Sequence, residues 1–108
     1  MSFTDLHNHL LPELDDGARS MADALEMARA LVSVGFGVAA PSPHHRAEYA
    51  PREVCLTRLE ETKAALAAAG IALELHVNAE NFFLDEGLLA QVSAAQGRTL
   101  GAAGAYLL

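Results

Sequence analysis

The sequence contains no tryptophan and only one cysteine, Cys55, in 108 residues. A lone cysteine excludes an intrachain disulfide and fits a reducing compartment. The sequence also lacks any apolar run near the ~20 residues that a membrane-spanning helix needs. Residues 1–6 carry neither a basic start nor an apolar stretch, so they do not resemble a signal peptide. These absences predict a cytoplasmic protein without a membrane span.

Basic residues are scarce: 7 Lys and Arg stand against 14 Asp and Glu, which gives a formal net charge of −7. An acidic surface repels the phosphate backbone, so nucleic acid is not an expected partner. A phosphorylated substrate would have to be attracted locally, by an arginine or a bound cation. The content of 52% hydrophobic and 19% charged residues is typical of one packed globular domain.

Short apolar segments alternate with helical patterns along the chain. Strands are expected at residues 3–6, 36–40 and 71–77. In the third of these, apolar side chains recur at every second position. Residues 101–108 resemble a turn that leads into a fourth strand. Three strand–helix units cannot close a barrel, which typically needs ~250 residues, so we expect the sequence to be a truncated, N-terminal part of a larger domain.

Three helices are expected between and after these strands. Ser20, with an acidic residue three positions later, resembles a helix N-cap, and Gly35 is a suitable stop. Pro51 suits the first turn of a second helix that ends at Gly70. Its apolar stripe consists of Cys55, Leu59, Thr62, Leu66 and Ala69. A third helix is expected at residues 85–96, and the alternation of strands and helices predicts an α/β fold with parallel strands.

Two histidines close the first expected strand. Side chains two apart on an extended strand point the same way, so His7 and His9 can converge on one metal ion. Alone this pair is a weak signal, because many such pairs are incidental surface histidines. Asp15 and Asp16 follow within one loop and supply the carboxylates that a divalent ion also accepts. Taken alone, the Asp16-Gly17 pair favours a turn with a helix cap over a metal site.

Further candidate ligands follow the second and third strands. His44 lies just past the second strand, with His45 as a secondary candidate, and Glu80 lies at the end of the third. Taken alone, the histidines are also typical of a solvated loop, and Glu80 is also typical of an exposed residue at a strand end. Loops at the carboxyl ends of parallel strands form the active face of barrel-like folds. Because three successive strand ends carry metal-type ligands, the sequence predicts a metal site at this edge.

Three segments resemble one known family. Residues 7–17 follow the pattern H-x-H-x-L-P-x-x-D-D-G, which resembles the opening of bacterial protein-tyrosine phosphatases of the PHP (polymerase and histidinol phosphatase) family. Ser42–His45 resembles their Thr/Ser-Pro-His-His segment, and Asn78–Glu80 resembles their Gly-Ala-Glu segment. Asn78 stands where glycine is usual, and Glu13 stands where glycine is common. The resemblance extends over the whole chain.

The resemblance implies a distorted (β/α)7 PHP barrel, of which residues 1–108 form about three βα units and the start of a fourth strand. It implies two or three divalent ions per complete site, with manganese favoured over iron or zinc. The metal ligands that it implies are His7, His9, Asp16, His44 and Glu80, with Glu80 bridging. The family's later ligands and substrate-binding arginines have no counterpart in this sequence, so the 108-residue chain alone is expected to be inactive.

The implied activity is the hydrolysis of protein phosphotyrosine by metal-activated water. The implied substrates are bacterial tyrosine kinases that regulate capsule and exopolysaccharide synthesis. Cys55 is not the expected nucleophile, because Glu61 occupies the arginine position of a C-x5-R phosphatase motif. Arg46 is a candidate phosphate contact, although a solvated loop arginine explains it equally well.

Two alternatives stay open. Another PHP phosphoesterase, such as a histidinol-phosphate phosphatase or a polymerase-associated exonuclease, would share the H-x-H pattern. The acidic charge disfavours the exonuclease, and the Asp15–Gly17 segment favours the tyrosine phosphatase. The second alternative is a catalytically inactive metal-binding fragment.

Overall fold

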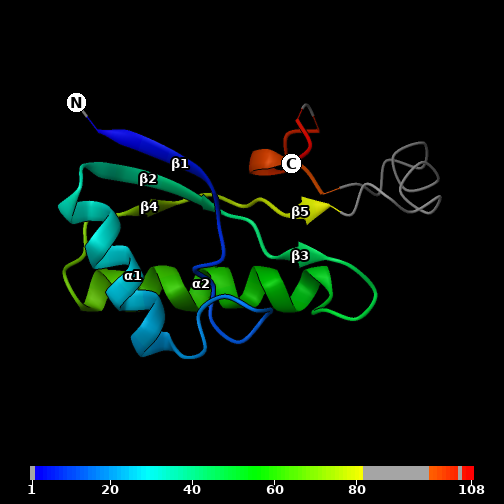
Figure 1. Cartoon of the computed structure of the whole chain (residues 1–108), viewed down its shortest axis with the longest axis horizontal. Coiled ribbons are helices and arrows are strands. Elements are labelled where there is room, and N and C mark those ends of the chain that lie inside the picture. Colours follow the sequence, from blue (N-terminus) through cyan, green and yellow to red (C-terminus); the bar gives the residue numbers. More distant parts are fainter. Residues whose placement is uncertain (1, 82–97, 105) are drawn as a thin grey trace.

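The computed structural model describes residues 2–81, 98–104 and 106–108 (Figure 1). In chain order the elements are β1 (Phe3–Asn8), α1 (Met21–Ser33), β2 (Phe36–Pro41), β3 (His44–His45), α2 (Arg52–Ala68), β4 (Glu74–Leu75), β5 (Glu80–Asn81) and the 3-10 helix η1 (Leu100–Ala102). Among these residues, neither α1 nor α2 combines the length and the apolar character needed to cross a bilayer. The helix expected at 85–96 lies outside the described residues.

Three parallel strands form the main sheet, in the order β1-β2-β4. Phe3 is the register partner of Phe36 at one end of β1, and Asn8 is the partner of Pro41 at the other. Both helices lie on the same side of this sheet (Figure 1). The α/β class with parallel strands is therefore confirmed, and the carboxyl ends of the strands share one edge.

The helix caps follow the sequence closely, with one shift. Ser20 is the N-cap of α1, and its Oγ accepts the Asp23 N–H at 3.1 Å. Gly35 follows the C-cap with a φ of 105°, a left-handed conformation that glycine adopts without a side-chain clash. Pro51, expected inside the first turn of α2, is the residue before it. Its ψ of 164° is extended rather than helical, so α2 begins at Arg52.

The stripe expected for α2 faces the interior except at its end. Cys55, Leu59, Thr62 and Leu66 are buried, whereas Ala69 is exposed at the C-cap. The helix ends before Ala69 can continue the buried face, because Gly70 takes a φ of 69°.

The third strand is shorter than its alternating pattern predicts. Burial alternates as expected, with Leu73 and Leu75 inside, but only Glu74 and Leu75 pair with β2. The Ile71 N–H donates to the Leu66 carbonyl at the end of α2, so that residue's donor is not available to the sheet.

The last segment does not form the strand expected within 101–108. Among the described residues it forms η1 and one antiparallel bridge between Thr99 and Leu107. Gly101 and Gly104 have φ values of 63° and 77°, which fold the segment back on itself. The Leu100 N–H consequently bonds to the Tyr106 carbonyl rather than to a neighbouring strand.

The loop after β1 is anchored in the core. Leu10, Leu11 and Leu14 are each at most 6% exposed and pack in one cluster with residues of both helices and the sheet. Burying a leucine contributes about 1.5–3 kcal/mol. Arg58 of α2 also donates to the Pro12 carbonyl and lies 3.2 Å from the Glu13 carboxylate. These contacts fix the loop that carries the candidate ligands.

Glu13 has an unusual backbone conformation for a residue other than glycine. Its φ is 61°, a left-handed conformation that favours glycine, which is the residue common at this position. Its ion pair with Arg58 partly offsets the strain.

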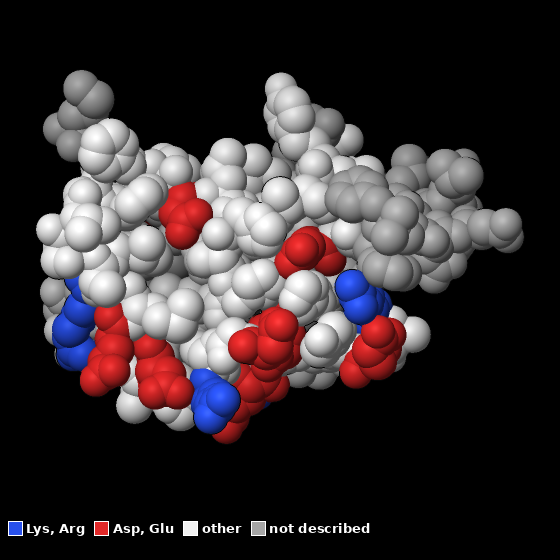
Figure 2. All heavy atoms as spheres, in the orientation of Figure 1, with Lys and Arg blue, Asp and Glu red and all other residues white. Residues whose placement is uncertain are grey.

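Charged side chains are unevenly distributed. On the face shown in Figure 2 most of them gather along the side covered by α1 and α2, while the sheet side is mostly uncharged. Apolar side chains are correspondingly exposed near β1 and the C-terminal segment, with Phe3 59%, Leu6 49% and Tyr106 71% exposed.

Candidate metal centre

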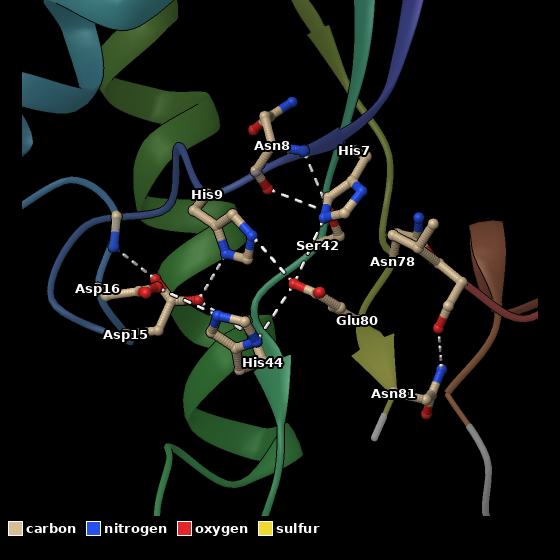
Figure 3. Close-up of polar contacts among 12 residues, drawn as sticks. His7, Asn8, His9, Asp15, Asp16, Ser42, His44, Asn78, Glu80 and Asn81 are labelled. Carbon is tan, nitrogen blue, oxygen red and sulfur yellow. Dashed lines mark hydrogen bonds and ion pairs between the residues drawn. The ribbon is translucent and has the colours of Figure 1, made fainter. Parts of the chain in front are cut away.

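The carboxylate of Glu80 lies at the point where three strand ends meet (Figure 3). Its Oε2 is 3.3 Å from His7 Nε2, 3.1 Å from His9 Nε2 and 3.2 Å from His44 Nδ1. His7 lies on β1 and His9 directly after it, His44 begins β3 and Glu80 begins β5. Three histidines that were predicted as ligands therefore surround one carboxylate oxygen of a fourth predicted ligand, Glu80.

A two-residue ladder brings His44 beside Glu80. β3 and β5 form a separate parallel pair in which His44 and Glu80 are register partners. The Glu80 N–H donates to the Pro43 carbonyl at 3.0 Å and holds the pair together. This pairing could not be predicted from the sequence, because a ladder of two register pairs has no periodic pattern.

Polar side chains join the ends of β1 and β2. The Ser42 N–H donates to the Asn8 carbonyl at 2.7 Å, and the Asn8 N–H donates to Ser42 Oγ at 3.1 Å. Ser42 is fully buried. Because Asn8 immediately precedes His9 and Ser42 is two residues before His44, these bonds fix the distance between the two histidines.

Asn78 performs a similar function at the third strand. Its side chain is buried and its Nδ2 donates to the Leu6 carbonyl at 3.1 Å. Asn78 therefore connects the backbone before Glu80 to the backbone before His7 through its side-chain amide.

The distances around Glu80 fit a divalent cation. Two ligand atoms each ~2.1 Å from one ion lie ~3.0 Å apart at a right angle and ~3.4 Å apart at the tetrahedral angle. The three nitrogen–oxygen distances to Glu80 Oε2 fall in this interval. Within the described part of the chain, this buried oxygen receives no hydrogen bond. Nitrogen and carboxylate donors at this spacing suit zinc, iron or manganese.

Asp16 lies on the other side of the His44 ring. Its Oδ1 is 3.1 Å from His44 Nε2, and its side chain is 73% exposed. The described residues thus contain two overlapping donor sets, one of His7, His9 and Glu80 and the other of His9, Asp15, Asp16 and His44. All five predicted ligands lie in this cluster.

The neighbours of His44 differ from one another. His45 points to Asn81, with 3.0 Å between its Nδ1 and Asn81 Oδ1, rather than to Glu80. Arg46 is exposed, and its Nη1 is 3.6 Å from Glu48 Oε1. Tyr49, which the sequence analysis did not assign to the site, stacks on the His44 ring with 5.1 Å between ring centroids.

Asp15, a candidate carboxylate from the sequence that the family resemblance does not include among the ligands, also lies in the site. Its side chain is only 1% exposed and accepts three hydrogen bonds. Burial raises the pKa of its carboxyl, but bonds from His9, Gly17 and His44 and the charge of His9 together lower that pKa below its ordinary value. Asp15 is therefore ionised in the folded chain at neutral pH.

A family comparison places these residues in a known group. The family described as "Capsular polysaccharide synthesis, CpsB/CapC" matches residues 3–108 of the sequence. The chain belongs to the CpsB/CapC family. The match includes the whole H-x-H segment, both aspartates and Glu80.

Two matches to known proteins illustrate the relationship. The Tyrosine-protein phosphatase YwqE of Bacillus subtilis (strain 168) is 51% identical over 41 residues, which are 38% of this chain and 16% of YwqE. A chain from crystal structures of YwqE from Bacillus subtilis and CpsB from Streptococcus pneumoniae, unique metal-dependent tyrosine phosphatases, is 27% identical with a TM-score of 0.83. The match covers 93% of this CpsB/CapC chain and 41% of the solved one. The chain thus spans less than half the length of that relative.

Acid is expected to destabilise the metal-free chain through Asp15. Because the pKa of this carboxyl is lower in the folded state than its ordinary 3.8, its ionised form stabilises the fold above that value. The contribution is lost as pH falls through the folded pKa. Thermal unfolding of wild type and Asp15→Asn, measured from about pH 6 downward, should show a difference in midpoint that narrows below about pH 4. A difference independent of pH would contradict this.

Proposed function

We propose that this chain supplies the first part of the metal centre of a PHP-type phosphomonoester hydrolase that acts on protein phosphotyrosine. The proposal depends chiefly on the convergence of three imidazole nitrogens on Glu80 Oε2. Membership of the CpsB/CapC family and the likeness to metal-dependent tyrosine phosphatases support it. We assign His7, His9, Asp16 and His44 as ligands and Glu80 as the bridging carboxylate.

The residues of the chain would act by binding and orienting. Bound divalent ions supply charge that neutralises phosphoryl oxygens and lower the pKa of a coordinated water toward ~7. Glu80 presents one oxygen to all three histidines, and Asp16 adds a carboxylate at the exposed rim. A tyrosine leaving group has a pKa near ~10 and needs little help from a general acid. Arg46 is proposed as a phosphate contact.

The complete site would require more polypeptide than these residues. The chain covers 41% of the solved relative, and the PHP resemblance implies further ligands and arginines from later strands. We therefore propose that residues 1–108 are the N-terminal part of a (β/α)7 PHP barrel in a cytoplasmic protein. Manganese is the proposed ion, with iron or zinc as substitutes. A bacterial tyrosine kinase that regulates capsule or exopolysaccharide synthesis is the proposed substrate.

Cys55 belongs to neither donor set of the described residues. Its modification therefore distinguishes a metal mechanism from a cysteine mechanism. The cysteine is buried in α2, and its Sγ contacts the Ala50 carbonyl. In the protein that carries this chain, chelation is expected to abolish phosphotyrosine hydrolysis and added Mn²⁺ to restore it. Treatment with iodoacetamide should leave activity unchanged. Activity that survives chelation but is lost on alkylation of Cys55 would overturn the metal mechanism.

The substrate distinguishes the tyrosine phosphatase from its alternatives. Hydrolysis rates should be compared on a phosphotyrosine peptide and on histidinol phosphate with the same metal-loaded protein. Faster turnover of histidinol phosphate would favour the histidinol phosphatase. Tight manganese binding without turnover of either substrate would favour a catalytically inactive metal-binding protein.

A further inference from the structure

Asp15 and Asp16 are adjacent in sequence but differ completely in environment. The Asp15 side chain is 1% exposed, whereas that of Asp16 is 73% exposed. Asp15 Oδ1 accepts the Gly17 N–H at 2.9 Å, and Oδ2 accepts the His44 N–H at 3.0 Å. Oδ2 also lies 2.9 Å from His9 Nδ1. Both carboxylate oxygens therefore accept hydrogen bonds from the protein, which makes Asp15 less available to an ion than the exposed Asp16.

The contact with His9 determines where that ring holds its proton. Each oxygen of Asp15 already accepts a backbone N–H, so the carboxylate acts as an acceptor on both sides, and the proton between Asp15 and His9 is assigned to His9 Nδ1. The neutral ring then has an unprotonated Nε2, which faces Glu80 Oε2 at 3.1 Å. A lone pair and a carboxylate oxygen repel each other at this distance unless a cation lies with them. Metal-bound histidines are commonly oriented by such a carboxylate on the other ring nitrogen.

We propose that Asp15 is a positioning residue that fixes the Nδ1–H tautomer of His9 and so directs Nε2 toward the metal centre. The role in directing Nε2 to a metal rests on the proposed function, whereas the contact between Asp15 and His9 is seen directly. Figure 3 shows Asp15 and Glu80 on opposite sides of the His9 ring.

The same carboxylate also connects two parts of the site. It holds the ring of His9, which follows β1, and the backbone N–H of His44, which begins β3. The loop that contains Asp15 is anchored by Leu14, which is 6% exposed. Asp15 therefore sets the position of one ligand through its side chain and of another through its main chain.

The Asp15→Asn substitution tests the tautomer. An asparagine can still accept the Gly17 N–H through its carbonyl, but its NH₂ group then donates to His9 Nδ1 and no longer accepts the His44 N–H. His9 would have to carry its proton on Nε2, the atom that faces Glu80. In ¹⁵N-labelled, metal-free chain, recorded where the ¹⁵N shifts of His9 show one protonated ring nitrogen, NMR should show Nδ1–H at His9 in wild type and Nε2–H in the variant. The affinity for Mn²⁺ should fall by about 10–100-fold.

Asp16→Asn is the matched control, because it removes a neighbouring carboxylate that we assign as a ligand. It should weaken Mn²⁺ binding while leaving His9 in the Nδ1–H tautomer. Asp23→Asn, at an exposed carboxylate in the first turn of α1, should change neither property. A His9→Gln variant assigns the His9 resonances. An Asp16→Asn variant that shifted the His9 tautomer would count against the distinct role of Asp15.

The wild-type spectrum tests the proposal even if Asp15→Asn fails to fold. An Nε2–H tautomer at His9 in the wild-type chain would overturn the positioning role outright. An Nδ1–H tautomer at His9, together with no Mn²⁺ binding by the whole protein that carries this chain, would uphold the positioning geometry and instead contradict the proposed metal function. The two hypotheses therefore fail on different measurements.

Discussion

Replacing His7 and His9 together by alanine is expected to remove tightly bound metal and phosphatase activity at the same time. The two side chains supply two of the three nitrogens within 3.3 Å of Glu80 Oε2. Loss of one outer partner of a ligand already costs ~10–100-fold in metal affinity or activity, so loss of two ligands should cost more than ~100-fold. Metal content after desalting and phosphotyrosine-peptide hydrolysis by the protein that carries this chain measure the effect.

His76 provides a control histidine on the same sheet. It lies directly after β4 with its side chain 49% exposed, and its Nε2 contacts Glu74 Oε1 at 2.7 Å, so it is hydrogen-bonded outside the cluster. His76→Ala should retain wild-type metal content and activity. A His7/His9 double variant that kept its metal would remove the basis of the ligand assignment.

The approach of His7 and His9 to one point is predictable from the sequence, because side chains two apart in an extended segment point the same way. Glu80 is expected at the end of the third strand, but β4 ends at Leu75, and Glu80 begins β5, which pairs with β3. The choice of His44 over His45 follows from the expectation that two adjacent loop histidines do not both point inward. In the structure His44 faces Glu80, and His45 faces Asn81.

Other features depend on long-range contacts that no local pattern contains. The roles of Asp15 and Asp16 cannot be separated from sequence, because adjacent loop residues point in directions set by tertiary packing. The ladder between β3 and β5 joins residues 36 positions apart through only two register pairs. The fold of residues 98–104 and 106–108 likewise depends on which backbone carbonyls accept their N–H groups, as the bond from the Leu100 N–H to the Tyr106 carbonyl shows.

The substitution Gly17→Ala is expected to displace His9 and disable the candidate centre. A Cβ at Gly17 would overlap the carbonyl oxygen and Cβ of His9, contacts that no relaxed structure tolerates. His9 or the loop must therefore move. A displacement near 1 Å at a catalytic group can cost ~100-fold in rate. We expect a loss of about that size in activity, together with weaker Mn²⁺ binding by the chain.

Gly70→Ala separates this steric effect from the general cost of replacing glycine. Gly70 has a φ of 69°, so alanine is strained there by roughly 1–2 kcal/mol, but no atom lies within 4 Å of its added Cβ. This variant should lower the thermal unfolding midpoint and leave Mn²⁺ affinity unchanged. Gly17 has no comparable backbone requirement, so its effect should be greatest on metal affinity. Wild-type Mn²⁺ affinity in Gly17→Ala would show that the Asp15–Gly17 turn can shift without moving His9. The close contact between Gly17 and His9 would then not be needed to position the ligands.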